Sequence, residues 1–107
     1  MKRFGQVIKV KGELFEQYKM YHAEVWKEVL HTISSCNIRN YSIYHKDDFL
    51  FAYFEYTGEN FARDMEKMSA CPFTKKWWSI MKPLQEPLAT RQEGEWWADM
   101  EEVFHLD

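Results

Sequence analysis

The hydrophobic pattern of the first half of the chain changes its period several times. Residues 3–10 (RFGQVIKV) predict a first strand. Residues 13–33 place apolar side chains three and four positions apart, which predicts one long amphipathic helix. Residues 38–45 and 49–56 predict two further strands, and the charged turn Lys46–Asp48 joins them into a hairpin.

The second half is more broken. A helix is predicted over about 59–70, and Pro72 stops it. A short helix over about 74–82 follows, then a long irregular segment over 83–98 and a last strand over about 100–106. The order β-α-β-β-α-β, with the second helical region in two pieces, predicts an α+β, ferredoxin-like fold. Such a fold has a four-stranded antiparallel sheet with helices on one face, and 107 residues predict a single domain, 1–107.

The strand predicted over 49–56 has consequences for assembly. Its sequence, FLFAYFEY, has seven apolar or aromatic residues out of eight, whereas a strand with one solvated face alternates polar and apolar residues. Helices cover one face of the sheet, and the chain has little left to cover the other. We therefore expect a homodimer of the dimeric α/β-barrel type, in which two sheets pack face to face.

Composition narrows the class of function. The net charge is −3, which argues against a nucleic-acid partner. No apolar run is long enough to span a membrane, and the N-terminus reads as a strand, not a signal peptide. Cys36 and Cys71 show no metal-type or redox-type spacing, so we expect a cytoplasmic protein with free thiols. The histidines show no metal-ligand spacing either, and no cofactor-binding motif appears.

His22 is the leading candidate for chemistry. Tyr18 precedes it by four residues and Trp26 follows it by four, so one helix would place all three on one apolar face. Imidazole both gives and takes protons near neutral pH. The alternative is a structural histidine, hydrogen-bonded to a backbone carbonyl.

Further aromatic residues could complete a site, in a chain that is 18% aromatic. Tyr41 lies early in the second predicted strand and Tyr44 on its opposite face, so Tyr41 can meet Tyr18 and His22. Trp77 and Trp78 point about 100° apart on a helix, which suggests one buried indole and one lining a cleft. Indole rings bind the apolar face of a sugar, although packing alone would also explain each of these aromatic residues. The pair Trp96-Trp97 could belong to a lid or a subunit contact.

These residues, taken in order, resemble a known family. The segments EQYKMYHAEVW (16–26), NYSIY (40–44), FAYFE (51–55), KWW (76–78) and EEVFHL (101–106) are similar to the L-rhamnose mutarotases. The resemblance covers nearly the whole chain. It departs from the family pattern where prolines commonly follow the histidine, because Glu24 and Lys27 stand there.

The resemblance implies a function and roles for individual residues. It implies a homodimeric enzyme that interconverts the α and β anomers of L-rhamnose without a cofactor or metal. It assigns proton donation to His22 and sugar binding to Tyr18, Tyr41, Trp77 and Trp78. A related 6-deoxy sugar such as L-fucose is a second candidate substrate. A cofactor-free monooxygenase and a non-catalytic ligand-binding or assembly module of the same fold are the alternatives.

Overall fold

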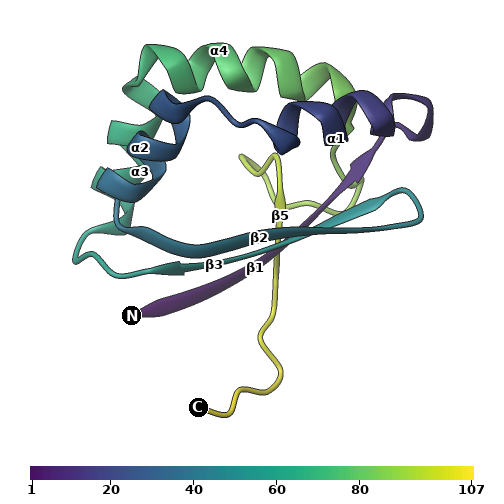
Figure 1. Cartoon of the computed structure of the whole chain (residues 1–107). Coiled ribbons are helices and arrows are strands. Elements are labelled where there is room, and N and C mark those ends of the chain that lie inside the picture. The colour runs from purple at the N-terminus through teal and green to yellow at the C-terminus, as the bar shows by residue number, and fades with distance from the viewer.

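One antiparallel sheet, with every helix on the same side of it, forms the framework of the molecule (Figure 1). The computed structural model describes residues 1–107. The sheet has the order β2-β3-β1-β4, and β5 also pairs with β1. The strands are β1 Lys2–Val10, β2 Ile38–Lys46, β3 Phe49–Tyr56, β4 Gln85–Glu86 and β5 Ala98–Met100.

The predicted α+β, ferredoxin-like class is confirmed, with one modification at the sheet edge. The fourth strand position is shared by two short strands, because β4 pairs with the end of β1 and β5 pairs with its middle. The residues between them, 87–97, leave the sheet and return. The long irregular segment predicted over 83–98 therefore contains one short strand of its own.

Alternation along the strands separates two faces of the sheet. In β3, Leu50, Ala52, Phe54 and Tyr56 are buried against the helices. Their neighbours point to the opposite face, which we call the outer face and on which Phe49 and Phe51 are exposed. No helix lies over the outer face (Figure 1).

The single helix predicted over 13–33 is wrong. The structure has a short 3-10 turn, Gly12–Leu14, followed by α1 Phe15–Ala23 and a separate α2 Lys27–Ser35. The backbone of Glu24 is not helical, with φ −139° and ψ 66°, so the helical hydrogen bonds stop there. Trp26 precedes α2 and is not part of α1.

The other helices follow local signals in the sequence. Helix α3, Phe61–Ala70, begins after Asn60, whose side chain accepts a hydrogen bond from the Arg63 N–H at 3.1 Å. Helix α4, Pro72–Met81, starts at Pro72, two residues earlier than predicted, because proline is well suited to a first helical position. A 3-10 turn, Lys82–Leu84, then leads into β4.

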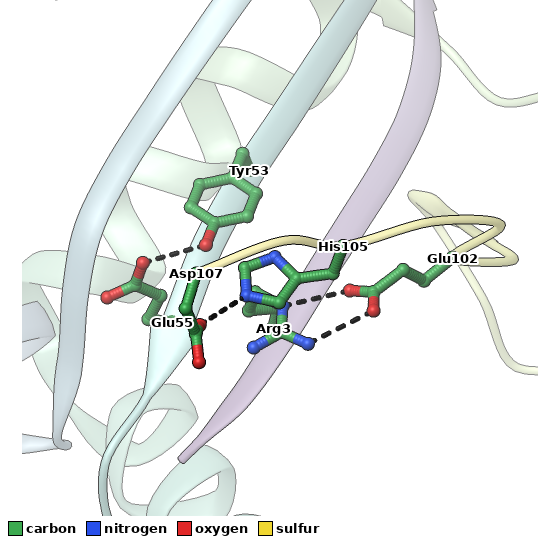
Figure 2. Close-up of polar contacts among 6 residues, drawn as sticks. All are labelled: Arg3, Tyr53, Glu55, Glu102, His105 and Asp107. Carbon is green, nitrogen blue, oxygen red and sulfur yellow. Dashed lines mark hydrogen bonds and ion pairs between the residues drawn. The ribbon is translucent and has the colours of Figure 1, made fainter.

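The last strand is shorter than predicted. The expected strand over 100–106 is wrong, since β5 ends at Met100 and residues 101–107 form an exposed tail without regular structure. The backbone pairing with β1 ends opposite Gly5. Beyond it only side chains connect the two segments: Arg3 donates two hydrogen bonds to Glu102, at 3.0 and 3.1 Å (Figure 2). The tail then leaves the sheet on the side away from the helices (Figure 1).

The main core lies between the sheet and the helices. Its buried members come from almost every element: Ile8, Val10, Tyr18, Val29, Leu50, Trp77, Met81 and Leu84. A second, smaller cluster joins Ile38, Phe54 and Tyr56. None of the helices is long and apolar enough to cross a membrane.

Candidate active site

Helix α1 brings Tyr18 and His22 together. They are four residues apart on one helix face, and their rings stack with centroids 4.2 Å apart and planes inclined by 27°. Tyr18 is only 3% exposed, whereas His22 is half-buried. The imidazole therefore reaches the surface beside a buried phenol.

A backbone hydrogen bond fixes the His22 ring. The His22 Nδ1–H donates to the Tyr18 carbonyl oxygen at 2.8 Å, because a carbonyl can only accept. This is the bond that the structural interpretation of His22 requires. It also places the proton of the neutral ring on Nδ1, which leaves Nε2 as a hydrogen-bond acceptor. Burial lowers the pKa of His22, and the bond to Tyr18 partly opposes that effect, so the ring is neutral at pH 7.

Trp77 forms the wall beside His22. Its indole meets the His22 ring edge-on at a centroid distance of 5.4 Å and the Trp26 ring at 5.1 Å. Trp26 thus joins the cluster, although the helix expected to carry it ends at Ala23. Trp77 is 6% exposed and Trp78 is half-buried, and both contact the main core. We expected one indole in the core and the other lining a cleft. The two indoles differ in exposed fraction, but both contact the core.

A β-bulge turns Tyr41 toward the helices. The pairing of β2 with β3 shifts between Arg39 and Ser42, and Asn40 adopts a left-handed conformation, with φ 51°. Tyr41 then packs on Phe54, on the helix side of the sheet, at 5.5 Å. Tyr44 lies opposite the outer-face residue Phe51, so the predicted separation of the two tyrosines is seen.

The protein around Tyr41 acts on its phenol group. The residue is 43% exposed, yet the surrounding protein raises the pKa of Tyr41 to about 12. Its charge in the ionised form also acts on Tyr18, whose pKa is raised mainly by burial. Both tyrosines are therefore neutral at pH 7. Ring contacts join Tyr18, His22 and Trp77, and Trp78 packs on the edge of the same core. Tyr41 contacts Phe54 and reaches Tyr18 only through its electrostatic effect.

Two residues of this cluster, Gln85 and Trp96, were not predicted to belong to the site. The Trp96 indole N–H donates to the Gln85 side-chain oxygen at 2.8 Å, and the Gln85 amide donates to the Tyr18 hydroxyl at 3.3 Å. Gln85 is 7% exposed, in β4. A glutamine in an irregular segment gives no sequence signal. The pair Trp96-Trp97 did stand out, but only the fold shows which of the two reaches the site.

This arrangement suits a small polyhydroxylated ligand. It combines neutral hydroxyl groups, an imidazole with a free Nε2 and flat aromatic walls, which can bind hydroxyls and move a proton. No group of three or more His, Cys, Asp or Glu side chains could hold a metal ion. Two open hollows lie elsewhere on the surface. One, of about 490 Å³, adjoins His31 and Phe73, and the other, of about 320 Å³, adjoins Lys11 and Asp48.

Solved structures with a similar fold include one named for the family that the sequence resembles. A crystal structure of an L-rhamnose mutarotase from Formosa agariphila superposes with a TM-score of 0.77 at 21% identity, over 100% of both chains. Tetracenomycin F2 cyclase from Streptomyces glaucescens, a type-II polyketide cyclase, superposes with a TM-score of 0.74 at 12% identity, over 100% of this chain and 98% of that one. At these identities both matches show the fold alone.

The sequence comparisons are more specific. Proteins named L-rhamnose mutarotase from Lactiplantibacillus plantarum and Bacillus subtilis are 33% and 30% identical, over 100% of each chain. A protein of the UPF0734 group from Dictyostelium discoideum is 34% identical over 89% of this chain and 80% of its own length. The family model described as L-rhamnose mutarotase matches residues 3–106. With a family-model match over residues 3–106, full-length relatives at 30% identity or more, and a fold that agrees with them, the chain belongs to the L-rhamnose mutarotase family.

Proposed function

We propose that the protein interconverts the α and β anomers of L-rhamnose. The observation that carries the proposal is the His22 ring, fixed by the Tyr18 carbonyl with Nε2 free, in a chain of the mutarotase family. Tyr18, Tyr41, Trp77 and Trp78 are the proposed sugar-binding residues. The deoxy methyl group of the sugar requires an apolar wall, which an indole can supply. A related 6-deoxy sugar such as L-fucose is a further candidate substrate.

The proposed reaction opens and closes the sugar ring by proton transfer. His22 Nε2 takes the proton from the anomeric hydroxyl, and water or a tyrosine hydroxyl gives a proton to the ring oxygen as the C1–O5 bond breaks. The C1–C2 bond of the open aldehyde rotates. On closure the O5 hydroxyl attacks the other face of C1 and gives its proton back to the water or tyrosine that supplied it. The imidazolium returns its proton to the former carbonyl oxygen, so His22 is also the acid of the second half-reaction.

The protonation state of His22 determines whether kcat/KM rises or falls with pH. Burial holds the pKa of His22 below its ordinary value of 6.5, so the form that starts the reaction is the neutral one. We expect kcat/KM to be constant at pH 7–8 and to fall as the pH drops through a midpoint below 6.5. A rate that rises toward acid pH would contradict the assignment of the neutral ring as the starting base.

The direct test is anomer exchange measured by NMR saturation transfer in equilibrated L-rhamnose. We expect the wild-type protein to accelerate exchange above the buffer rate, and to do so more for L-rhamnose than for sugars that carry a 6-hydroxyl group. L-Fucose serves as the second 6-deoxy sugar. No acceleration with either sugar would contradict the proposed function.

We also propose that the protein is a homodimer in which the outer faces of two sheets meet. Three aromatic residues of the outer face are exposed, namely Tyr44, Phe49 and Phe51. The tail adds Val103, Phe104 and Leu106, each at least 79% exposed. Apolar side chains gathered in this way favour a protein partner, and a two-fold axis lets one surface serve both copies.

Polar groups on the outer face support a specific contact. Tyr53 donates to Glu55 at 2.7 Å, and the tail residue His105 pairs with Asp107 at 2.7 Å (Figure 2). Together with the Arg3–Glu102 pair, they gather polar groups on the part of the outer face that the tail adjoins (Figure 2). Interfaces between subunits combine such polar groups with apolar side chains.

Light scattering coupled to size-exclusion chromatography tests the dimer. We expect wild-type protein at twice the chain mass and Phe51→Glu at the chain mass, because a charge would be desolvated at the interface. Lys2→Glu, at an exposed residue at the start of β1, is the control and should stay dimeric. A wild-type protein that is monomeric at micromolar concentration would contradict the proposal. The cytoplasmic location stays a prediction.

A further inference from the structure

A chain of hydrogen bonds leads from the irregular segment 87–97 into the candidate active site. Trp96 Nε1 donates to Gln85 Oε1 at 2.8 Å, and Gln85 Nε2 donates to the Tyr18 hydroxyl oxygen at 3.3 Å. The Lys82 ammonium lies 5.4 Å from the centre of the Trp96 ring and gives the indole a cation–π contact. Hydrogen bonds thus connect the side chains of Trp96, Gln85 and Tyr18 in series.

The direction of this chain is fixed by its first member. An indole N–H can only donate, so the atom of Gln85 that faces Trp96 must be the oxygen. The amide nitrogen of Gln85 then faces Tyr18 and donates to it. Without Trp96 the two ends of the amide could exchange places. Gln85 is 7% exposed, so water has little access to change this arrangement.

The consequence falls on the hydroxyl of Tyr18. Its oxygen accepts from Gln85, so its own proton is not used in that bond and can be donated elsewhere. Burial raises the pKa of Tyr18, which keeps this proton in place at neutral pH. Tyr18 therefore presents a hydrogen-bond donor beside the imidazole on which its ring stacks.

We propose that Gln85 and Trp96 are positioning residues that make the Tyr18 hydroxyl a hydrogen-bond donor to an oxygen of the bound sugar. This inference rests on the proposed function, and it gives the segment 87–97 a role in sugar affinity. The acceptor is a sugar hydroxyl or ring oxygen, since both have free lone pairs. Trp97, the neighbour of Trp96, has no part in this chain of bonds.

Gln85→Glu reverses the critical bond with little change in shape. The introduced carboxylate accepts from Trp96 as before, but it also accepts from Tyr18, so the Tyr18 proton turns away from the sugar. We expect the KM for L-rhamnose to rise about 5- to 10-fold, the usual effect of losing one hydrogen bond, and the thermal stability to fall, because the carboxylate is desolvated at this buried position. The pH midpoint of kcat/KM should rise, because a carboxylate beside Tyr18 favours the protonated form of the stacked His22 ring.

Two variants separate positioning from packing. Gln85→Met removes the amide and leaves the half-buried Trp96 N–H without a partner, so it should also lose stability but raise the KM less than Gln85→Glu. Trp96→Phe should raise the KM by about 2- to 5-fold, because the amide can then turn over. Trp97→Phe is the matched control and should leave the KM unchanged. Equal effects of Trp96→Phe and Trp97→Phe on the KM would overturn the proposal.

A double-mutant comparison tests the route through Tyr18. In a Tyr18→Phe background there is no hydroxyl to orient, so Gln85→Glu should change the KM by less than 2-fold. If Gln85→Glu raises the KM as much in that background as in wild type, Gln85 acts without Tyr18 and the inference is wrong.

The inference can fail separately from the proposed function. The indole N–H signals of the five tryptophans can be followed by ¹⁵N NMR without any sugar. We expect the Trp96 signal to exchange faster with water in Gln85→Met than in wild type, and the Trp97 signal to stay the same. An unchanged Trp96 signal would overturn the hydrogen-bond chain even if the enzyme is active. A protein without activity but with the expected signals would overturn only the role in sugar binding.

Discussion

Trp77 and Trp78 are adjacent, but the structure predicts different consequences when each is replaced by alanine. Trp77 is 6% exposed and meets the rings of Tyr21, His22 and Trp26 edge-on, with centroids 6.0, 5.4 and 5.1 Å away. Trp78 is half-buried, at the margin of the same core. Replacing the first removes the ring contacts of α4 with α1 and with Trp26, the residue before α2.

The magnitudes follow from burial. A fully buried tryptophan replaced by alanine costs about 3–5 kcal/mol of folding free energy, so Trp77→Ala should fall in that range. Trp78→Ala leaves less of a cavity and should cost about 1–2 kcal/mol. For a domain of this size a difference of about 2 kcal/mol corresponds to about 8–16 °C in melting temperature.

Urea unfolding at one fixed protein concentration measures both variants, because dimerisation makes stability depend on concentration. The L-rhamnose KM is measured in parallel, at a temperature where both variants are folded. We expect Trp77→Ala to be the less stable variant. We expect the main effect of Trp78→Ala to be on the KM for L-rhamnose and not on stability. Equal losses of stability, or a loss below about 1 kcal/mol for Trp77→Ala, would refute this account of how the two indoles differ.

Two further predictions concern groups outside the site. The contact with Thr32, whose Oγ1 lies 3.2 Å from the Cys71 Sγ, and the backbone N–H groups at the start of α4 lower the pKa of Cys71 to about 7, whereas burial raises the pKa of Cys36. Alkylation by iodoacetamide, read by mass spectrometry, should therefore modify Cys71 first, with a pH midpoint near 7; prior modification of Cys36 would contradict this. Hydrogen bonds from Tyr56 and Asn37 lower the pKa of Asp64, so its carboxylate stabilises the fold above the unfolded value near 4 and loses that effect as the pH falls. Between pH 7 and pH 3.5, the free energy of unfolding measured in urea should change less for Asp64→Asn than for wild type. An equal change in both proteins would contradict the assignment.

The sequence predicted the first three strands well because their signals are local. The strand predicted over 49–56 coincides with β3, and the charged turn at Asp47-Asp48 sets the register of the hairpin. In β3, inward and outward side chains alternate as a sheet with one covered face requires. The aromatic outer face of this strand also led to the prediction of a second subunit.

The interruption between α1 and α2 was missed because no residue there opposes a helix. Residues 13–33 contain neither glycine nor proline, and the apolar spacing continues through Glu24 and Val25. The family pattern commonly has prolines near this point, and in their place stand Glu24 and Lys27. The helix is interrupted there all the same, so tertiary contacts, with Trp26 packing on Trp77, determine where it ends.

Part of the site was predictable because it also follows from a local pattern in the sequence. Tyr18 and His22 meet through a four-residue helical spacing that the sequence displays, and Trp77 is adjacent to them once the helices pack. Tyr41 required the bulge at Asn40, and Gln85 required a strand of only two residues. Both features depend on long-range pairing, which no local pattern specifies.

The measurement that tests the central claim most directly is anomer exchange of L-rhamnose by wild type, His22→Ala and His31→Ala. His31 is an exposed histidine on α2 and serves as the matched control. We expect His31→Ala to keep the wild-type rate and His22→Ala, folded by circular dichroism, to lose about 10²–10⁴-fold. A folded His22→Ala protein that exchanges the anomers at the wild-type rate would contradict the assignment of proton transfer to His22.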